Sequence, residues 1–419
     1  MPWLLLAVGV VAVTSTANAL WPRRGRWSLG PSFLASWVTI ELALHWLAVL
    51  VAVGAVAVLL GGADHPAGVV GLVLAALAAG GLVVVGLQGR RTVVQVRDSL
   101  QELELAPDAP RFPRSHLILP VLVNHRRGVR QVRNIEFARV AGRRLRLDLT
   151  LPVDAAPGDR RPVVLQIHGG AWVFGDKREQ GRPLLNHLAV QGWVGVNANY
   201  RLSPGATFPD HLVDCKRALA WIRAHVAEWG GDPDFVAVTG GSAGGHLAAL
   251  VALTAGDPRY QPGFEDVDTS VRAAVPFYGA YDFTNRLGTW PDTVRPLLLE
   301  PWVMKAFYDE DPERFAEASP IDRVHAGAPP FMVVHGDRDT LCPVEDARLF
   351  VERLRAVSRQ PVVYAEMKGA QHAFEIFPSV RAARAIEGAA GFLAAMHARR
   401  GQAPPAKEAE AEQVLTDRA

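Results

Sequence analysis

The residues best suited to chemistry are 240–244, which form a G-x-S-x-G motif (GGSAG) centred on Ser242. The motif follows the apolar run Phe235–Val238 and precedes a helical stretch, and a serine in such a strand-turn-helix context can act as a nucleophile. The turn projects the hydroxyl from the edge of a sheet, and glycines flank it because there is no room for Cβ atoms. We therefore predict that Ser242 is a catalytic nucleophile.

A second glycine-rich segment, residues 168–172 (HGGAW), follows the apolar run Val163–Ile167. Acyl transfer needs hydrogen-bond donors aimed at an oxygen that becomes negative in the transition state. The backbone N–H groups of Gly169 and Gly170, together with that of Ala243, are the predicted donors. His168 is expected to hold this loop by hydrogen bonding rather than to accept a proton from the nucleophile.

A serine nucleophile needs a base, and the base needs a carboxylate that orients it. In this type of fold the chain order is serine, then acid, then histidine. His372 lies in a loop just after a strand-like run and before a helical stretch, so it is the predicted base. The other downstream histidines lie in helical stretches or beside strand-like runs: His246, His325, His335 and His397.

Two carboxylates are candidates for the acid, and both lie in residues 335–343 (HGDRDTLCP). Asp337 directly follows a glycine, which suits a side chain that hydrogen bonds to its own turn. Asp339 lies deeper in the loop, where a carboxylate can reach His372. We predict that Asp339 orients the base.

The elements that must position these residues alternate in type along the chain. Apolar strand-like runs occur at Val163–Ile167, Val194–Ala198, Phe235–Val238, Ala273–Phe277, Phe331–Val334 and Val362–Ala365. Helical stretches between and after them cover Asp210–Trp229, Ala243–Thr254, Val344–Val357 and Val380–Arg399. Strands buried on both faces and separated by helices predict an α/β fold, doubly wound around a mostly parallel sheet.

The first ninety residues are much more apolar than the rest and predict a transmembrane region, either a helical hairpin or three helices. The candidate spans cover approximately residues 3–20, 33–60 and 68–88. The last two are long enough to cross a hydrocarbon core of ~30 Å and to form the hairpin. Residues 3–20 are either a further span or a signal peptide cleaved after Ala19. No Lys or Arg precedes Arg23, which favours the span.

The arginines near these spans predict the orientation of the chain. Three lie between residues 23 and 26 and three between residues 90 and 97, whereas the loop at 61–66 has none. Positively charged flanks tend to stay in the cytoplasm. We therefore expect the catalytic region to face the cytoplasm from the inner cell membrane, with the lipid bilayer as its partner.

Two ionisable residues, Glu41 and His45, lie four positions apart in the second candidate span and would share a helix face. Ionisable groups inside a membrane are costly, so they are commonly functional or paired within a bundle. We expect these two side chains to satisfy each other.

The composition excludes several classes of function. The formal net charge is +2, so nothing indicates nucleic acid or another polyanionic partner. Two cysteines, Cys215 and Cys342, do not make a disulfide framework, and no Cys/His cluster has metal-ligand spacing. We predict no metal and no cofactor, and no feature indicates an oligomeric state.

The remaining chain divides into a polar connector at 91–130, a catalytic domain at 131–400 and a tail at 401–419 that is predicted to be disordered. An apolar insertion at 281–320 contains Trp290 and Trp302. It is either a lid over the nucleophile or a small helical subdomain that packs down. These two tryptophans and Trp172 are the candidate residues of a substrate pocket or lid.

Together the motifs resemble the hormone-sensitive-lipase-like branch of the α/β-hydrolases, the bacterial esterases and lipases, over residues 163–392. The resemblance rests on residues 168–172, Asn199–Leu202 with Pro204 and Pro209, residues 240–246, Gly336-x-x-Asp339, and His372. It implies a triad of Ser242, Asp339 and His372, with oxyanion donors at Gly169, Gly170 and Ala243.

The chain departs from that family in two places. Ala171 stands where the third glycine of the oxyanion loop is usual, as in the H-G-G-x-W loop of arylformamidases. The apolar N-terminal region replaces the soluble cap of many members and makes the chain similar to membrane-anchored carboxylesterases of actinobacteria.

These features predict the hydrolysis of lipophilic carboxylic esters. The alternatives are an arylformamidase-like amide hydrolase and a non-catalytic interaction module with the same fold.

Overall fold

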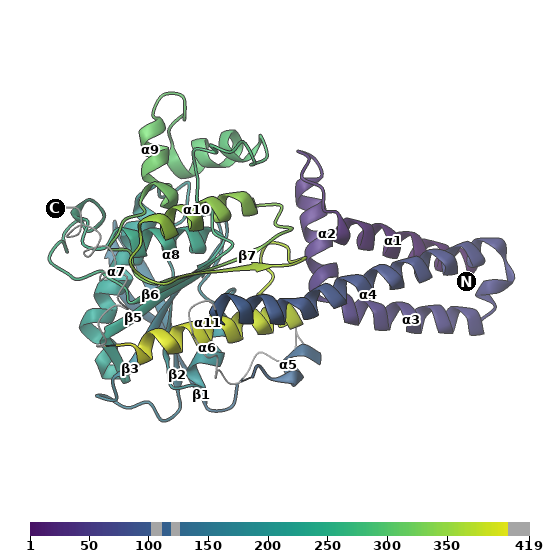
Figure 1. Cartoon of the computed structure of the whole chain (residues 1–419), viewed down its shortest axis with the longest axis horizontal. Coiled ribbons are helices and arrows are strands. Elements are labelled where there is room, and N and C mark those ends of the chain that lie inside the picture. Colours follow the sequence, from purple (N-terminus) through teal and green to yellow (C-terminus); the bar gives the residue numbers. More distant parts are fainter. Residues whose placement is uncertain (102–110, 119–125, 401–419) are drawn as a thin grey trace, which may run out of the picture.

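A bundle of long apolar helices projects from an α/β domain in the computed structural model of the chain (Figure 1). The structure describes residues 1–101, 111–118 and 126–400, without the side chains of residues 93–95. The tail predicted at 401–419 and much of the expected connector, residues 102–110 and 119–125, lie outside the described residues.

The domain is built on one eight-stranded sheet with the order β1-β2-β4-β3-β5-β6-β7-β8. The strands are β1 (Val129–Val140), β2 (Arg143–Pro152), β3 (Arg161–Ile167), β4 (Val194–Ala198), β5 (Gly231–Gly241), β6 (Ala273–Phe277), β7 (Phe331–Gly336) and β8 (Val362–Met367). β2 pairs antiparallel with β1 and β4, and the pairs from β4 to β8 are all parallel. The carboxyl ends of the parallel strands therefore meet at one edge, as the predicted α/β fold requires.

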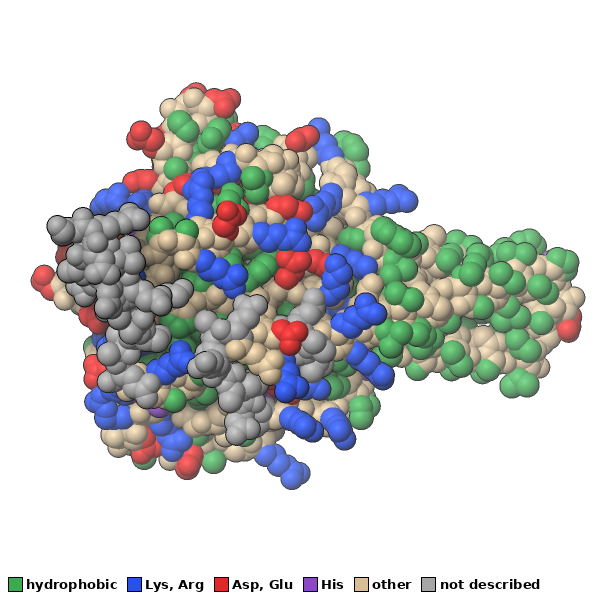
Figure 2. All heavy atoms as spheres, in the orientation of Figure 1, with side chains coloured by type: hydrophobic (Ala, Val, Ile, Leu, Met, Phe, Trp, Pro, Cys, Tyr) green, Lys and Arg blue, Asp and Glu red, His purple; other side chains and the backbone are tan. Residues whose placement is uncertain are grey.

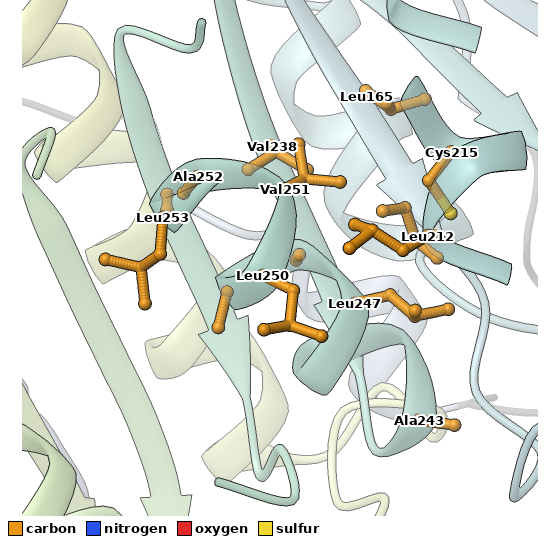
Figure 3. Packing of buried hydrophobic residues seen from close by; sticks show 14 of the residues in the cluster. Leu165, Leu212, Cys215, Val238, Ala243, Leu247, Leu250, Val251, Ala252 and Leu253 are labelled. Atoms are coloured by element: carbon orange, nitrogen blue, oxygen red, sulfur yellow. The ribbon is translucent and has the colours of Figure 1, made fainter. Parts of the chain in front are cut away.

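Helices cover both faces of the sheet and bury it in two cores. One core holds α7 (Asp210–His225), α8 (Ala243–Leu253) and α10 (Val344–Val357); the other holds α6 (Arg182–Ala189) and α11 (Val380–Ala398). β3 contributes Val163 and Leu165 to the first core and Val164 to the second, because successive side chains of a strand point to opposite faces. Figure 3 shows Leu247 and Val251 of α8 among residues of the first core.

The N-terminal bundle consists of α1 (Pro2–Leu20), α2 (Leu29–Glu41), α3 (Ala43–Leu59) and α4 (Pro66–Gln101), with a short 3₁₀ turn, η1 (Gly62–Asp64), before α4. Among the described helices, α1 and α4 are long and apolar enough to cross a membrane, and the bent pair α2–α3 is a third candidate. α1 packs very closely on α4, since a Cβ atom at Gly9 would lie 2.4 Å from the carbonyl oxygen of Gly71.

The candidate span at 33–60 is not one straight helix, because the chain bends by 84° between α2 and α3. α2 lies across the ends of α1 and α3 next to the domain, whereas α4 runs past it (Figure 1). Its buried face is polar: Ser36 accepts a hydrogen bond from Gln371, and Glu41 accepts one from Ser379. Hydropathy alone missed the break because it ignores such specific partners.

The boundary expected near residue 90 falls within α4, so residues 91–101 of the expected connector continue that helix. This end of α4 is part of the domain's second core through Val96 and Leu100, and Ser99 Oγ donates to Tyr364 O of β8 at 2.8 Å. α4 therefore joins the bundle to the domain as one continuous helix. The short helix α5 (Arg114–Ile118) follows in the described part of the connector.

Glu41 and His45 do not pair with each other as expected. Besides its bond from Ser379, Glu41 lies in the electrostatic field of the buried Arg381 on α11. His45 Nε2 instead lies 3.1 Å from the carbonyl oxygen of Ile118. The bend after α2 separates the two faces, and the carboxylate meets the catalytic domain.

Apolar side chains dominate the surface of the bundle, whereas basic side chains gather where it meets the domain (Figure 2). Trp3 at the start of α1 lies against His65 beside η1, with ring centroids 5.9 Å apart. This end of the bundle, which holds the N-terminus, lies away from the domain (Figure 1). The arginines at 23–26 lie in the α1–α2 linker at the near end, where Arg24 donates to Asp339 O.

Candidate active site

Ser242 occupies the turn between β5 and α8, as the motif predicts. Its backbone angles are φ 59° and ψ −123°, a left-handed conformation that is strained for a residue with a Cβ atom. The flanking glycines allow the strand and helix to approach: a Cβ atom at Gly240 would lie 2.4 Å from Gly244 O, and one at Gly244 would lie 2.1 Å from Ile167 O. The turn therefore needs glycine at both positions and holds the serine hydroxyl at the sheet edge.

The structure brings Ser242, His372 and Asp339 into one hydrogen-bonded chain. His372 Nε2 lies 2.8 Å from Ser242 Oγ, and its Nδ1 lies 2.7 Å from Asp339 Oδ2. An ionised carboxylate can only accept, so Nδ1 carries a proton and Nε2 is free to accept the serine proton. This is the geometry that a Ser-His-Asp nucleophile requires.

Asp339 is fully buried, yet it is strongly favoured in its ionised form. Burial alone would raise the pKa of this carboxyl, but the charge and hydrogen bonds of His372 and His335 hold it well below its usual range. The other oxygen, Oδ1, accepts from the backbone N–H groups of Leu341 and Cys342, each at 2.8 Å. The carboxylate is thus fixed in orientation from both sides.

Asp337, the rival acid, serves the loop instead. Its Oδ1 accepts from the N–H of Gly369 at 2.6 Å, and its Oδ2 pairs with Lys368 at 2.8 Å. These contacts connect the loops after β7 and β8 and leave Asp339 as the carboxylate on His372.

His335 is a site residue that the sequence did not reveal. Its Nε2 lies 3.0 Å from Cys342 O and 3.3 Å from Asp339 Oδ2. Both atoms are acceptors, so Nε2 carries the proton and gives the buried carboxylate a second imidazole donor. The only sequence signal was the spacing of four residues between His335 and Asp339, which has no special meaning outside a helix.

A buried pair also supports the ring of His372. Tyr278 donates its hydroxyl proton to Glu375, and its ring lies 4.6 Å from the imidazole of His372 between centroids. Burial raises the pKa of both the Glu375 carboxyl and the Tyr278 hydroxyl. The sequence carries no motif for this pair, because its members are about a hundred residues apart and meet only in the fold.

The oxyanion prediction needs one correction. The N–H of Gly169 donates to Gln180 Oε1 at 2.7 Å, so this donor is already used within the protein. Within the described residues the N–H groups of Gly170, Ala171 and Ala243 have no acceptor. Gly170 and Ala171 have φ values of 116° and 50°, so successive left-handed residues turn this loop.

His168 holds the oxyanion loop, as expected. Its Nδ1 donates to Gly169 O at 2.7 Å, and its ring stacks on Tyr200 with centroids 4.5 Å apart. Burial lowers the pKa of His168, so the ring stays neutral.

The three candidate pocket tryptophans do not come together. Trp172 is only 4% exposed and packs on Phe283, and Trp290, at 6% exposure, donates from its indole to Asp346 of α10. Trp290 also lines a cleft of about 500 Å³ together with residues Arg24–Arg26 of the linker before α2. Trp302, in the π-helical segment η4 (Arg295–Met304), is 42% exposed.

The insertion packs down on the first core through Leu299 and Val303, and continues as α9 (Pro312–Glu317). Trp172 and Trp290 are therefore core residues, whereas η4 leaves Leu297 and Trp302 exposed.

His246, which follows the nucleophile by one helical turn, packs as expected and leads to a prediction about pH. It accepts from Trp172 Nε1 at 3.2 Å and donates to Ala318 O at 2.7 Å, and burial lowers its pKa to about 3. A histidine whose pKa is lower in the folded protein than in the unfolded chain must be neutral for the protein to fold. Its contribution to the free energy of unfolding is therefore complete above the unfolded-state pKa of about 6.5 and is lost as the pH falls toward 3. By pH 4 the loss is expected to be about 3 kcal/mol.

Thermal unfolding of the full chain at pH 7, 5 and 4 measures this loss. The His246→Gln variant, which retains a donor and an acceptor, should lose less of its melting temperature between pH 7 and 4 than the wild type. Equal losses of melting temperature in the two proteins would show that protonation of His246 does not cause the destabilisation at low pH.

Comparisons with known proteins agree with this geometry. The family model described as BD-FAE matches residues 147–354. The probable carboxylic ester hydrolase LipM of Mycobacterium tuberculosis is 52% identical over 61% of the chain, and the esterase LipQ of the same organism is 46% identical over 66%. These matches span 59% and 65% of the two relatives, so the chain covers less than two thirds of their length.

A solved esterase shares the fold. The propionate-bound structure of an esterase from Thermogutta terrifontis has a TM-score of 0.55 and 27% identity, and the match covers 64% of this chain and 95% of that one. Its sarin-phosphonylated form matches with a TM-score of 0.56 at 27% identity, over 63% and 94% of the two chains. Together with the mostly parallel sheet and the nucleophile turn, these likenesses show that the chain has the α/β-hydrolase fold and that it is similar in sequence to bacterial esterases.

Proposed function

We propose that this protein hydrolyses carboxylic esters through an acyl-enzyme formed on Ser242. The observation that carries the proposal is the continuous hydrogen-bond chain from Ser242 Oγ through His372 to the buried Asp339. The names of the relatives, carboxylic ester hydrolase and esterase, support the same reaction.

The reaction follows from the positions of these groups. Ser242 Oγ attacks the ester carbonyl while His372 Nε2 takes the serine proton, and Asp339 stabilises the imidazolium that forms. The free N–H groups of Gly170, Ala171 and Ala243 are the candidate donors to the oxyanion. His372 then protonates the leaving alcohol, and a water molecule activated by the same ring hydrolyses the acyl-enzyme.

The two alternatives have less support. An arylformamidase-like activity rested on the H-G-G-x-W loop, but none of the relatives and structures compared above has a name that refers to an amide. A non-catalytic module would need no aligned nucleophile, and here Ser242 retains both its base and its strained turn.

Turnover of p-nitrophenyl acyl esters, compared with that of N-formylkynurenine, tests the reaction. We expect the full chain to hydrolyse the esters and to show little activity on the formamide. The Thermogutta terrifontis esterase is phosphonylated by sarin, so a fluorophosphonate probe suits this site as well. If the folded protein neither turns over esters nor reacts with the probe, the proposal fails.

We also propose that the protein is a multi-pass protein of the inner cell membrane with its catalytic domain in the cytoplasm. α1, α4 and the bent pair α2–α3 supply the candidate spans. The contact of Arg338 with Ala19 O, at 3.0 Å, favours α1 as a retained helix rather than a cleaved signal peptide. Basic residues gather at the end of the bundle that meets the domain, and this distribution supports the cytoplasmic orientation.

Such an anchor favours lipophilic esters and a role in lipid metabolism, because esters dissolved in the bilayer are concentrated where the enzyme lies. Protease digestion of intact cells, compared with inverted vesicles, tests the orientation. The catalytic domain should be cleaved only in the inverted vesicles, and cleavage in intact cells would reverse the assignment.

A further inference from the structure

Helix α2 lies directly against the loop that carries His372, although the two are more than 330 residues apart in the chain. Three consecutive loop residues contact it. Gln371 donates from Nε2 to Ser36 Oγ at 2.9 Å, and Trp37 Nε1 donates to Ala373 O at 2.9 Å. Between these two bonds the ring of Phe33 meets His372 edge-on, with centroids 6.1 Å apart.

Gln371 connects α2 to both catalytic loops through one fully buried side chain. Its Oε1 accepts from the N–H of Thr340, which follows Asp339, at 2.9 Å, and from the N–H of His372 at 2.8 Å. Two N–H donors on one atom identify it as the oxygen, so the amide nitrogen points to Ser36. Ser36 donates its own proton to Phe33 O at 3.0 Å and is therefore an acceptor for Gln371.

The remaining contacts hold backbone that is strained or close to the acid. Ala373 has a φ of 61°, a left-handed conformation that is unfavourable for a residue with a Cβ atom, and its carbonyl is the one that Trp37 binds. In the linker before α2, Arg24 donates to Asp339 O at 2.9 Å. The N-terminal region thus contacts the loops of the base and the acid at the same time.

We propose that α2 is a positioning element of the active site, and that Ser36 and Gln371 are positioning residues that set the alignment of His372 between Ser242 and Asp339. The inference rests on the proposed esterase function. Catalytic groups need to be held within about 0.5 Å of their productive positions by neighbours that are themselves fixed. Ser36 and Gln371 do not touch the reacting atoms, so their loss lowers kcat and leaves KM nearly unchanged.

The test uses the full chain in detergent with p-nitrophenyl butyrate. Ser36→Ala removes the acceptor on α2, and Trp37→Phe removes the bond to Ala373 while keeping an aromatic ring. Each is expected to lower kcat about three- to tenfold, with KM within about twofold of the wild type.

The linker just before α2 offers a matched control for each variant. Ser28 makes its side-chain bond to Gly25 O, and Trp27 is 86% exposed. Ser28→Ala and Trp27→Phe should leave both kcat and KM unchanged.

A double mutant separates positioning from a general loss of packing. Gln371→Leu cuts the link at its centre, so adding Ser36→Ala to it should lower kcat no further. Unchanged kcat in Ser36→Ala and Trp37→Phe, a rise in KM alone, or fully multiplicative losses in the double mutant would overturn the proposal.

A spectroscopic measurement keeps this test independent of turnover. The proton on His372 Nδ1, held by Asp339, gives a far-downfield NMR signal, and Ser36→Ala should shift or broaden it while Ser28→Ala does not. If the wild type failed to hydrolyse esters, the proposed function would fall, and this signal would still decide the role of α2. An identical signal in Ser36→Ala and the wild type overturns the positioning role.

Discussion

The Ser242→Ala variant is expected to lose ester hydrolysis by on the order of 10⁵- to 10⁶-fold in kcat, because the three triad residues act as one unit. Without Oγ there is no acyl-enzyme, and His372 has no proton to accept. Fluorophosphonate labelling should disappear in the same variant. The measurements are the initial rate with p-nitrophenyl butyrate and covalent labelling of the intact protein.

The fold should survive this change. Alanine keeps the Cβ atom and the same strained backbone, and the turn is held by the N–H of Ser242 on Phe277 O at 3.0 Å, which a side-chain substitution does not remove. The melting temperature is therefore expected to stay close to that of the wild type. Ser358→Ala is a suitable control, since Ser358 bonds within its own turn to Gln360. Labelling that persists in Ser242→Ala would place the nucleophile elsewhere.

Most of the sheet could be predicted because its strands are short, apolar and buried on both faces. β4, β6 and α10 have the bounds expected from the sequence, residue for residue. The predicted acid, Asp339, lies in the loop after β7, and the predicted base, His372, lies in the loop after β8. These two strands pair with each other. Their closeness follows from topology, because the carboxyl ends of neighbouring parallel strands share one edge.

What could not be predicted depends on contacts between distant segments. Composition assigned α2 to a membrane span, and only the fold shows that Ser36 and Glu41 have partners on the catalytic domain. The same holds for Gly169, whose N–H is taken by a glutamine eleven residues later in the chain. Trp172 and Trp290 were candidates for a pocket because they are aromatic and near the motifs, but exposure depends on the packing around them.

The contacts of α2 also connect the apolar N-terminal region to the candidate active site. A helix that belongs to the apolar N-terminal region lies over the histidine loop and binds Gln371 and Ala373. If α2 positions His372 as proposed, substitutions in the first forty residues will alter catalysis.

The second large effect is expected for Asp339→Asn. Oδ1 accepts from two backbone N–H groups, those of Leu341 and Cys342, so the asparagine oxygen must occupy that position. Its NH₂ group then faces His372 Nδ1 and His335 Nε2, from which the carboxylate oxygen accepted hydrogen bonds. His372 is forced into the tautomer with its proton on Nε2, which cannot accept the proton of Ser242.

This tautomer should lower kcat by about 10⁴-fold at neutral pH, as wrong-tautomer variants of such triads do. Asp337→Asn is the matched control, because Asp337 lies two residues earlier and binds Gly369 and Lys368 instead of His372. It should keep its rate within about threefold, since the asparagine oxygen can still accept from the N–H of Gly369 and the ion pair that is lost is to Lys368, whose side chain is 57% exposed. Rates with p-nitrophenyl butyrate, read beside the melting temperatures, distinguish the two variants. The backbone N–H groups of Leu341 and Cys342 leave the asparagine side chain of Asp339→Asn no other arrangement. Equal rates for Asp339→Asn and Asp337→Asn would therefore mean that Asp339 does not orient His372.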